Sequence, residues 1–226
     1  MVSVKNRLAL DAVIFVATLL SMAYTWTGTF RHELVGTVAV VGVIAHLFIN
    51  RRWYGKAFTT KGVPMNGWRK TLNCLLLFVT LGMTVSSLLL SKYLFAFLGF
   101  GGANVGLTPH LICGYWGFLI MALHIGMHGS MLLAQWKKTA LGKWMAAHSW
   151  VGKALAVVAI VYGAYGLWVQ EYGAHLFMRI GTSDLAYPHG FWLFTAEQLA
   201  IVGLFAVAIY YYSQWKNKRR IAKARA

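Results

Sequence analysis

Acidic side chains and cysteines are scarce in this chain of 226 residues. Five Asp and Glu stand against 21 Lys and Arg, and two cysteines are present. Charged residues make up 12% of the chain, well below the roughly 25% that is usual in a soluble domain. The shortage of acids disfavours metalloprotease-type zinc chemistry. His124 and His128 have the His-x3-His spacing of such sites, but the Glu that should follow the first histidine is missing.

Apolar residues, at 59% of the chain, gather in long blocks. Such blocks are typical of a multi-pass membrane protein, because each approaches the ~20 residues that a helix needs to cross a bilayer. Blocks of this length favour helices over barrel strands, since a backbone in lipid must satisfy its own hydrogen bonds. We therefore predict an all-α bundle of six transmembrane helices in one domain, residues 1–226. The predicted spans are Leu8–Trp26, Glu33–Asn50, Thr71–Lys92, His110–Gln135, His148–Gln170 and Phe191–Ser213.

The net charge of +16 has a strong directional bias. Eighteen of the 21 cations fall in the N-terminal segment, the second and fourth connections, the start of the fifth span and the C-terminal tail. The positive-inside rule then predicts that both termini are cytoplasmic. The tail Lys216–Arg225 is expected on an anionic lipid leaflet, so the charge indicates membrane lipid and not nucleic acid. The same topology separates Cys74 from Cys113 across the membrane and excludes a disulfide between them.

Two histidine pairs share one spacing inside the apolar blocks. His32 and His46 are fourteen residues apart, and so are His110 and His124. Fourteen residues of helix rise about 21 Å and return to within roughly 40° of the starting direction. The second and fourth predicted spans would therefore each have one imidazole near each membrane face, on a common side. Because these spans run parallel, we expect His32 level with His110 and His46 level with His124.

Glycine follows three histidines by four residues, in the pairs His32 with Gly36, His110 with Gly114 and His148 with Gly152. Position i+4 lies on the same helix face. Glycine is costly inside a helix, and its missing side chain would let a flat macrocycle approach the backbone. A haem iron held by two neutral imidazoles fits this pattern. We predict two haem b groups, an outer one held by His32 and His110 and an inner one held by His46 and His124.

The inner haem has two alternative ligands. His128 lies five helical turns from His110 and on the same face, and His148 opens the fifth predicted span at the inner membrane level. Either could replace His124 or His46. Otherwise, His128 is expected near the haem propionates or the interface, and His148 in the headgroup region.

The pattern of His32 with Gly36 and His46, followed by His110 with Gly114 and His124, resembles the flavinylation-associated cytochrome domain, a family of small bacterial membrane proteins. The ligand spacing is also similar to that of the cytochrome b subunit of quinol-oxidising bc complexes. The resemblance covers residues 5–170. It implies a di-haem b-type cytochrome of the bacterial inner membrane that exchanges electrons with an extracytosolic redox protein, often a flavoprotein.

The function that we predict is transmembrane electron transfer through the two haems, which links the quinone pool to an extracytosolic partner. The sequence has no flavin, nucleotide or iron–sulfur motif, so we expect a subunit or relay of a larger oxidoreductase, with quinone as a further candidate ligand. A small transporter or channel with histidines on a proton or metal path is the alternative. The nearly apolar middle of the spans favours haem.

Two carboxylates and two loop histidines complete the candidates. Asp11 and Glu197 fall inside apolar spans, where a carboxylate suggests a proton relay or quinol site. A buried, hydrogen-bonded structural role is the alternative for Glu197. His175 and His189, in the last outer loop, could accept a proton from quinol or contact a partner, or simply be solvated.

Overall fold

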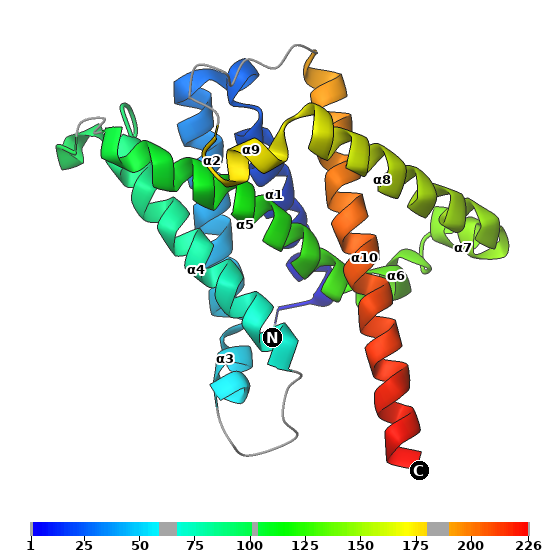
Figure 1. Ribbon diagram of the computed structural model, residues 1–226. Helices are drawn as coiled ribbons and strands as arrows, with labels where there is room; N and C mark the ends of the chain where they lie inside the picture. The colour runs from blue at the N-terminus through cyan, green and yellow to red at the C-terminus, as the bar shows by residue number, and fades with distance from the viewer. Residues whose placement is uncertain (1, 59–66, 101–103, 180–189, 226) are drawn as a thin grey trace. The chain divides into compact units, whose positions relative to one another are not determined.

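The computed structural model describes residues 2–58, 67–100, 104–179 and 190–225. This part of the chain is all-helical, with 89% of residues in helix and no strand. The helices are shown in Figure 1 and are α1 (Val4–Met22), α2 (Tyr24–Ile49), α3 (Arg51–Phe58), α4 (Gly67–Leu90), α5 (Leu107–Met127), α6 (Gly129–Trp136), α7 (Ala140–Ala147), α8 (Ser149–Val169), α9 (Tyr172–Leu176) and α10 (Phe191–Arg225), with short 3₁₀ turns η1 (Ala96–Leu98) and η2 (Asn104–Gly106).

Five helices are long and apolar enough to cross a membrane, namely α2, α4, α5, α8 and α10 up to Arg219. Large apolar side chains such as Phe78 on α4, 73% exposed, cover their outer surfaces. Lipid contact accounts for this exposure, because a soluble protein rarely presents continuous apolar surface. The predicted all-α membrane fold is confirmed at this level. The first predicted span, Leu8–Trp26, overlaps α1 and extends into α2; α1 is a helix of 19 residues that contains Lys5, Arg7 and Asp11 and is not among the five. A sixth span and the cytoplasmic termini therefore stay predictions.

The chain divides into two compact units. The first comprises Met1–Gly117 and His175–Thr195, and the second comprises Phe118–Ala174 and Ala196–Ala226. Each unit is described by itself below.

In the first unit, α1 and α2 lie side by side (Figure 1). Ser3 caps the start of α1 by accepting a hydrogen bond from the amide of Asn6. Gly42 of α2 leaves so little space that a β-carbon there would come within 2.7 Å of Ile14 on α1. The absence of a side chain at this point allows the two backbones to approach.

In the second unit, α5 and α8 each contact α10 through a glycine. A β-carbon at Gly126 of α5 would collide with the backbone of Ala206. A β-carbon at Gly163 of α8 would lie 2.5 Å from the carbonyl oxygen of Ala200. Membrane helices pack closely through small residues of this kind, because lipid provides no hydrophobic force that favours helix association.

The structure differs from the predicted spans at three places. The connection between the first two predicted spans, residues 27–32, lies inside α2, where Gly28 takes a non-helical conformation (φ 64°) and kinks the helix. The connection after the second span contains α3, an additional helix. The fourth predicted span, His110–Gln135, ends early, because α5 stops at Met127 and α6 begins at Gly129.

Candidate functional site

The first unit brings two of the predicted haem ligands together. His32 on α2 and His110 on α5 lie with their ring centroids 5.8 Å apart and their planes inclined by 66°. Both side chains are partly buried. Tyr24 packs edge-on against His32, with the two ring centroids 5.2 Å apart.

The separation of the two rings fits a shared metal. With metal–imidazole bonds of about 2.0–2.1 Å, two histidines on one iron would hold their ring centroids about 6 Å apart. The Nδ1 atom of His32 is buried and, among the described residues, has no hydrogen-bond partner. A buried nitrogen without a partner is unfavourable, so a metal bound at Nδ1 itself would remove this cost, while the same ring also contacts the backbone of Ser21. The donor chemistry and the spacing of the two residues therefore suit a haem iron.

Two serines of α4 contact Nδ1 of His110. The hydroxyls of Ser86 and Ser87 both donate to the carbonyl oxygen of Met83, at 3.0 and 2.7 Å. The same oxygens lie 3.5 and 3.4 Å from Nδ1 of His110. With each hydroxyl proton directed to Met83, the serine oxygens are available to accept from the ring. This arrangement favours the tautomer with the proton on Nδ1, in which Nε2 retains the lone pair that a metal requires.

The glycines differ in the space beside them. A β-carbon at Gly36, or at Gly152, would meet no described atom within 4 Å. A β-carbon at Gly114 would lie 3.2 Å from the Cε atom of Met83, the mobile end of a flexible side chain. Gly36 therefore leaves an open surface one turn from His32, as the haem hypothesis requires.

Glu33, the neighbour of His32, joins α2 to the segment that follows α4. Its carboxylate accepts hydrogen bonds from the hydroxyl of Ser91 (2.8 Å) and from the backbone amides of Lys92, Tyr93 and Leu94 (2.7–3.1 Å). Four donors on one carboxylate form a strong anchor, because hydrogen bonds to a charged group are about twice as strong as neutral ones. This contact holds the His32 end of α2 beside the end of α4. The sequence drew attention to Glu33 only as one of five acidic residues, and nothing in it predicted this contact.

His46 lies near the other end of α2 and contacts α1. Its Nδ1 atom is 2.7 Å from Oδ1 of Asp11. This hydrogen bond gives the carboxylate inside the apolar α1 helix a partner. The predicted partner of His46, His124, belongs to the second unit, so the inner pairing stays a prediction.

The second unit contains the other three candidate ligands. The rings of His124 and His128 lie 4.9 Å apart, centroid to centroid. His128 lies at the break between α5 and α6, as the N-cap of α6 with φ −92° and ψ 3°, so the continuous helix assumed in the prediction ends one residue before it. His148 is exposed at the start of α8, and its Nδ1 lies 2.9 Å from the carbonyl oxygen of Trp144.

A buried chain of polar side chains joins the end of α8, α9 and α10 in the second unit. The Tyr172 hydroxyl donates to Gln198 (2.6 Å), the Gln198 amide donates to Gln170 (2.9 Å), and the Gln170 amide donates to Glu197 (2.7 Å). Glu197 is fully buried. The sequence indicated the carboxylate but not its partner Gln170, nor the hydrogen bonds that continue from Gln170 to Gln198 and Tyr172. The arrangement agrees with the structural role considered for Glu197.

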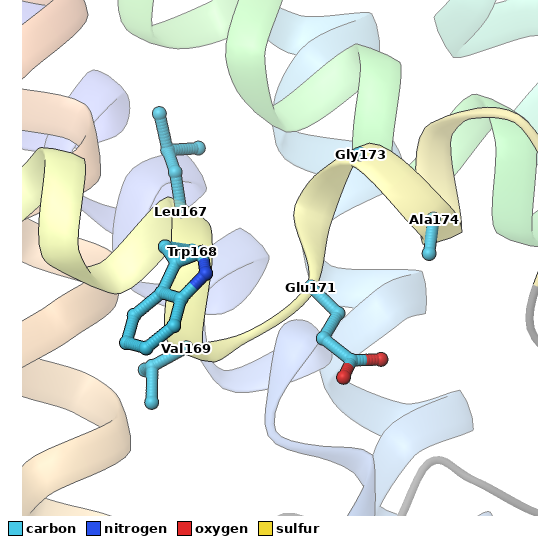
Figure 2. A pocket seen from close by; sticks show the side chains of 6 residues that line it. All are labelled: Leu167, Trp168, Val169, Glu171, Gly173 and Ala174. Atoms are coloured by element: carbon cyan, nitrogen blue, oxygen red, sulfur yellow. The ribbon is translucent and has the colours of Figure 1, made fainter.

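An open cavity of about 480 Å³ lies beside this segment. Figure 2 shows its lining, with the Glu171 carboxylate pointing into the space and Trp168 at one side; Leu167, Val169, Gly173 and Ala174 complete it. None of the histidines lines this cavity. Within the described residues, no three His, Cys, Asp or Glu side chains form a metal-binding group. A haem iron needs only two protein ligands, so the His32–His110 pair would be sufficient to hold one.

Of the two loop histidines, His175 belongs to the first unit and lies at the end of α9. Its ring is stacked on Tyr115 of α5, with centroids 4.5 Å apart and planes inclined by 3°. This contact agrees with a packing role and places His175 out of free solvent. His189 lies outside the described residues.

Comparison with known proteins identified no similar protein. Neither a protein-family profile, a curated protein nor a solved structure matches the chain. The site must therefore be interpreted from its own geometry.

Proposed function

We propose that this protein is a membrane-embedded b-type cytochrome that transfers electrons across the bilayer through two bis-histidine haems. The observation that carries the proposal is the facing of His32 and His110 at 5.8 Å from two different helices. When bound, haem supplies reversible one-electron chemistry at its iron. The chain's own part is to supply imidazole nitrogens in the correct tautomer and to surround the macrocycle with apolar helices.

The second haem site rests on His46, with His124 as its partner and His128 or His148 as alternates. The spacing of fourteen residues supports it, and so does the 2.7 Å contact that orients His46. Metal-ligating histidines commonly donate their other ring N–H to a carboxylate. Asp11 provides this acceptor.

The proposed cellular role is a relay in the bacterial inner membrane, with both termini cytoplasmic. Electrons would pass between the quinone pool and an extracytosolic redox protein, such as a flavoprotein. The apolar helices support the membrane location. The quinone, the partner and the orientation are part of the proposal and come from the charge bias and the family resemblance.

An absorption spectrum of the purified protein with haem quantification tests the proposal. We expect a Soret band, a reduced α band and two haems per chain. His32→Ala and His110→Ala should each lose one haem and retain the other, because the two rings share an iron. His124→Ala should lose the second haem, while His128→Ala should retain it.

The contrary results are equally definite. Two haems in both His32→Ala and His110→Ala would refute their pairing. Loss of the second haem in His128→Ala but not in His124→Ala would move that ligand by one helical turn. A colourless wild-type protein would refute the cytochrome and favour a transporter or a scaffold.

A further inference from the structure

Two of the candidate haem ligands, His46 on α2 and His110 on α5, have groups of different charge beside their Nδ1 atoms. His46 contacts the carboxylate of Asp11 at 2.7 Å. His110 contacts two neutral hydroxyls at 3.4 and 3.5 Å. One ligand therefore has a short hydrogen bond to an acid, and the other has two long contacts to alcohols.

The Asp11 contact determines which nitrogen of His46 can bind a metal. An ionised carboxylate has no proton to donate, so the proton of this hydrogen bond comes from Nδ1. The lone pair of the ring is then on Nε2. The position of Asp11 in the middle of α1, an otherwise apolar helix beyond its first turns, also needs an explanation, because a carboxylate is costly in an apolar segment.

Charge also changes the strength of the ligand. A carboxylate draws the Nδ1 proton toward itself and makes the opposite nitrogen more basic. A more basic imidazole donates more electron density and stabilises ferric over ferrous iron, and hydrogen bonding around the ligands is one of the means by which a protein sets a haem potential. Neutral hydroxyls at longer distance exert this effect more weakly, because charge-assisted hydrogen bonds are about twice as strong.

We propose that Asp11 is a positioning and tuning residue for the haem on His46, which holds the Nδ1–H tautomer and lowers the midpoint potential of that haem. This inference rests on the proposed function. It assigns a role to the one acidic residue of α1 and makes the two haem sites electronically unequal through a difference in ligand environment.

Redox potentiometry of the full-length Asp11→Asn protein tests this inference. Asparagine has nearly the same shape, and its amide oxygen can still accept from Nδ1, so only the charge is removed. We expect both haems to be retained, one midpoint potential to shift to a more positive value and the other to stay at its wild-type value. The low-spin ferric electron paramagnetic resonance signal of the same single haem should change.

A second background identifies which haem responds. His32→Ala is expected to retain only the haem on His46, so the positive shift should appear undiminished when Asp11→Asn is added to it. Thr18→Val is the matched control on α1, because the Thr18 hydroxyl, among the described residues, donates only to the carbonyl oxygen of Ile14 in its own helix. Neither potential should move in this control.

Four results would overturn the inference. Unchanged potentials in Asp11→Asn, an equal shift of both haems, or loss of a haem would each exclude a tuning role and leave the cytochrome proposal standing. A wild-type protein without haem would instead refute the proposed function, and this inference with it.

Discussion

The open surface beside Gly36 allows a sharp test of where the macrocycle lies. Gly36 is one helical turn from His32, and a β-carbon there would meet no described atom within 4 Å. The β-carbon of a leucine at this position therefore meets no described atom of the protein. Because glycine is about 1 kcal/mol less favourable than Ala or Leu inside a helix, Gly36→Leu should leave the free energy of unfolding unchanged or raise it by up to this amount.

The same substitution should nevertheless remove one haem. If the porphyrin occupies the space beside Gly36, a leucine side chain competes for that volume, and the haem content should fall from two per chain to one. Gly36→Ala, which adds only one methyl group, should retain more of the second haem than Gly36→Leu. The measurements are haem quantification by absorption and thermal unfolding in detergent.

The control for this prediction is Val38→Leu on the same helix. Val38 is already exposed, and the change adds one methylene group two residues away along α2. We expect two haems and unchanged unfolding. Two haems in Gly36→Leu, with its spectrum unaltered, would refute the placement of the macrocycle on this face.

Two further predictions concern Glu33 and Glu197, whose carboxylates accept hydrogen bonds that join helices to other segments within one unit. Glu33→Ala removes the acceptor of four hydrogen bonds and should destabilise the protein by about 1–3 kcal/mol, with partial loss of one haem; water can rehydrate the exposed amides, which limits the cost. Unaltered melting and haem content would contradict this. Glu197→Leu leaves the buried Gln170 amide without its 2.7 Å acceptor and should cost about 1–3 kcal/mol in thermal unfolding, whereas Glu197→Gln, which keeps an acceptor oxygen, should cost less. Equal stability of these two variants would exclude the structural role.

Local sequence patterns were sufficient for the helical membrane fold. Long apolar blocks specify helices in lipid because the backbone must hydrogen-bond within its own segment. Boundaries were less predictable. The kink at Gly28 and the break between Met127 and Gly129 depend on local dihedral angles, and both interrupt segments that are apolar on either side. Hydropathy alone does not register such breaks.

The histidine spacing predicted which residues to consider, and the contacts decided what surrounds them. Fourteen residues make close to a whole number of helical turns. The sequence therefore already predicted that His32 and His110 occupy equivalent positions on their helices. The acceptors were not predicted: Asp11 and His46, or Ser87 and His110, come from different helices, and their meeting depends on helix rotation and close approach. The sequence by itself determined a chain of apolar helices with spaced imidazoles, because both properties repeat with the helical period. Only the tertiary structure decided which side chains each imidazole faces, because those contacts form between segments whose relative rotation no local pattern encodes.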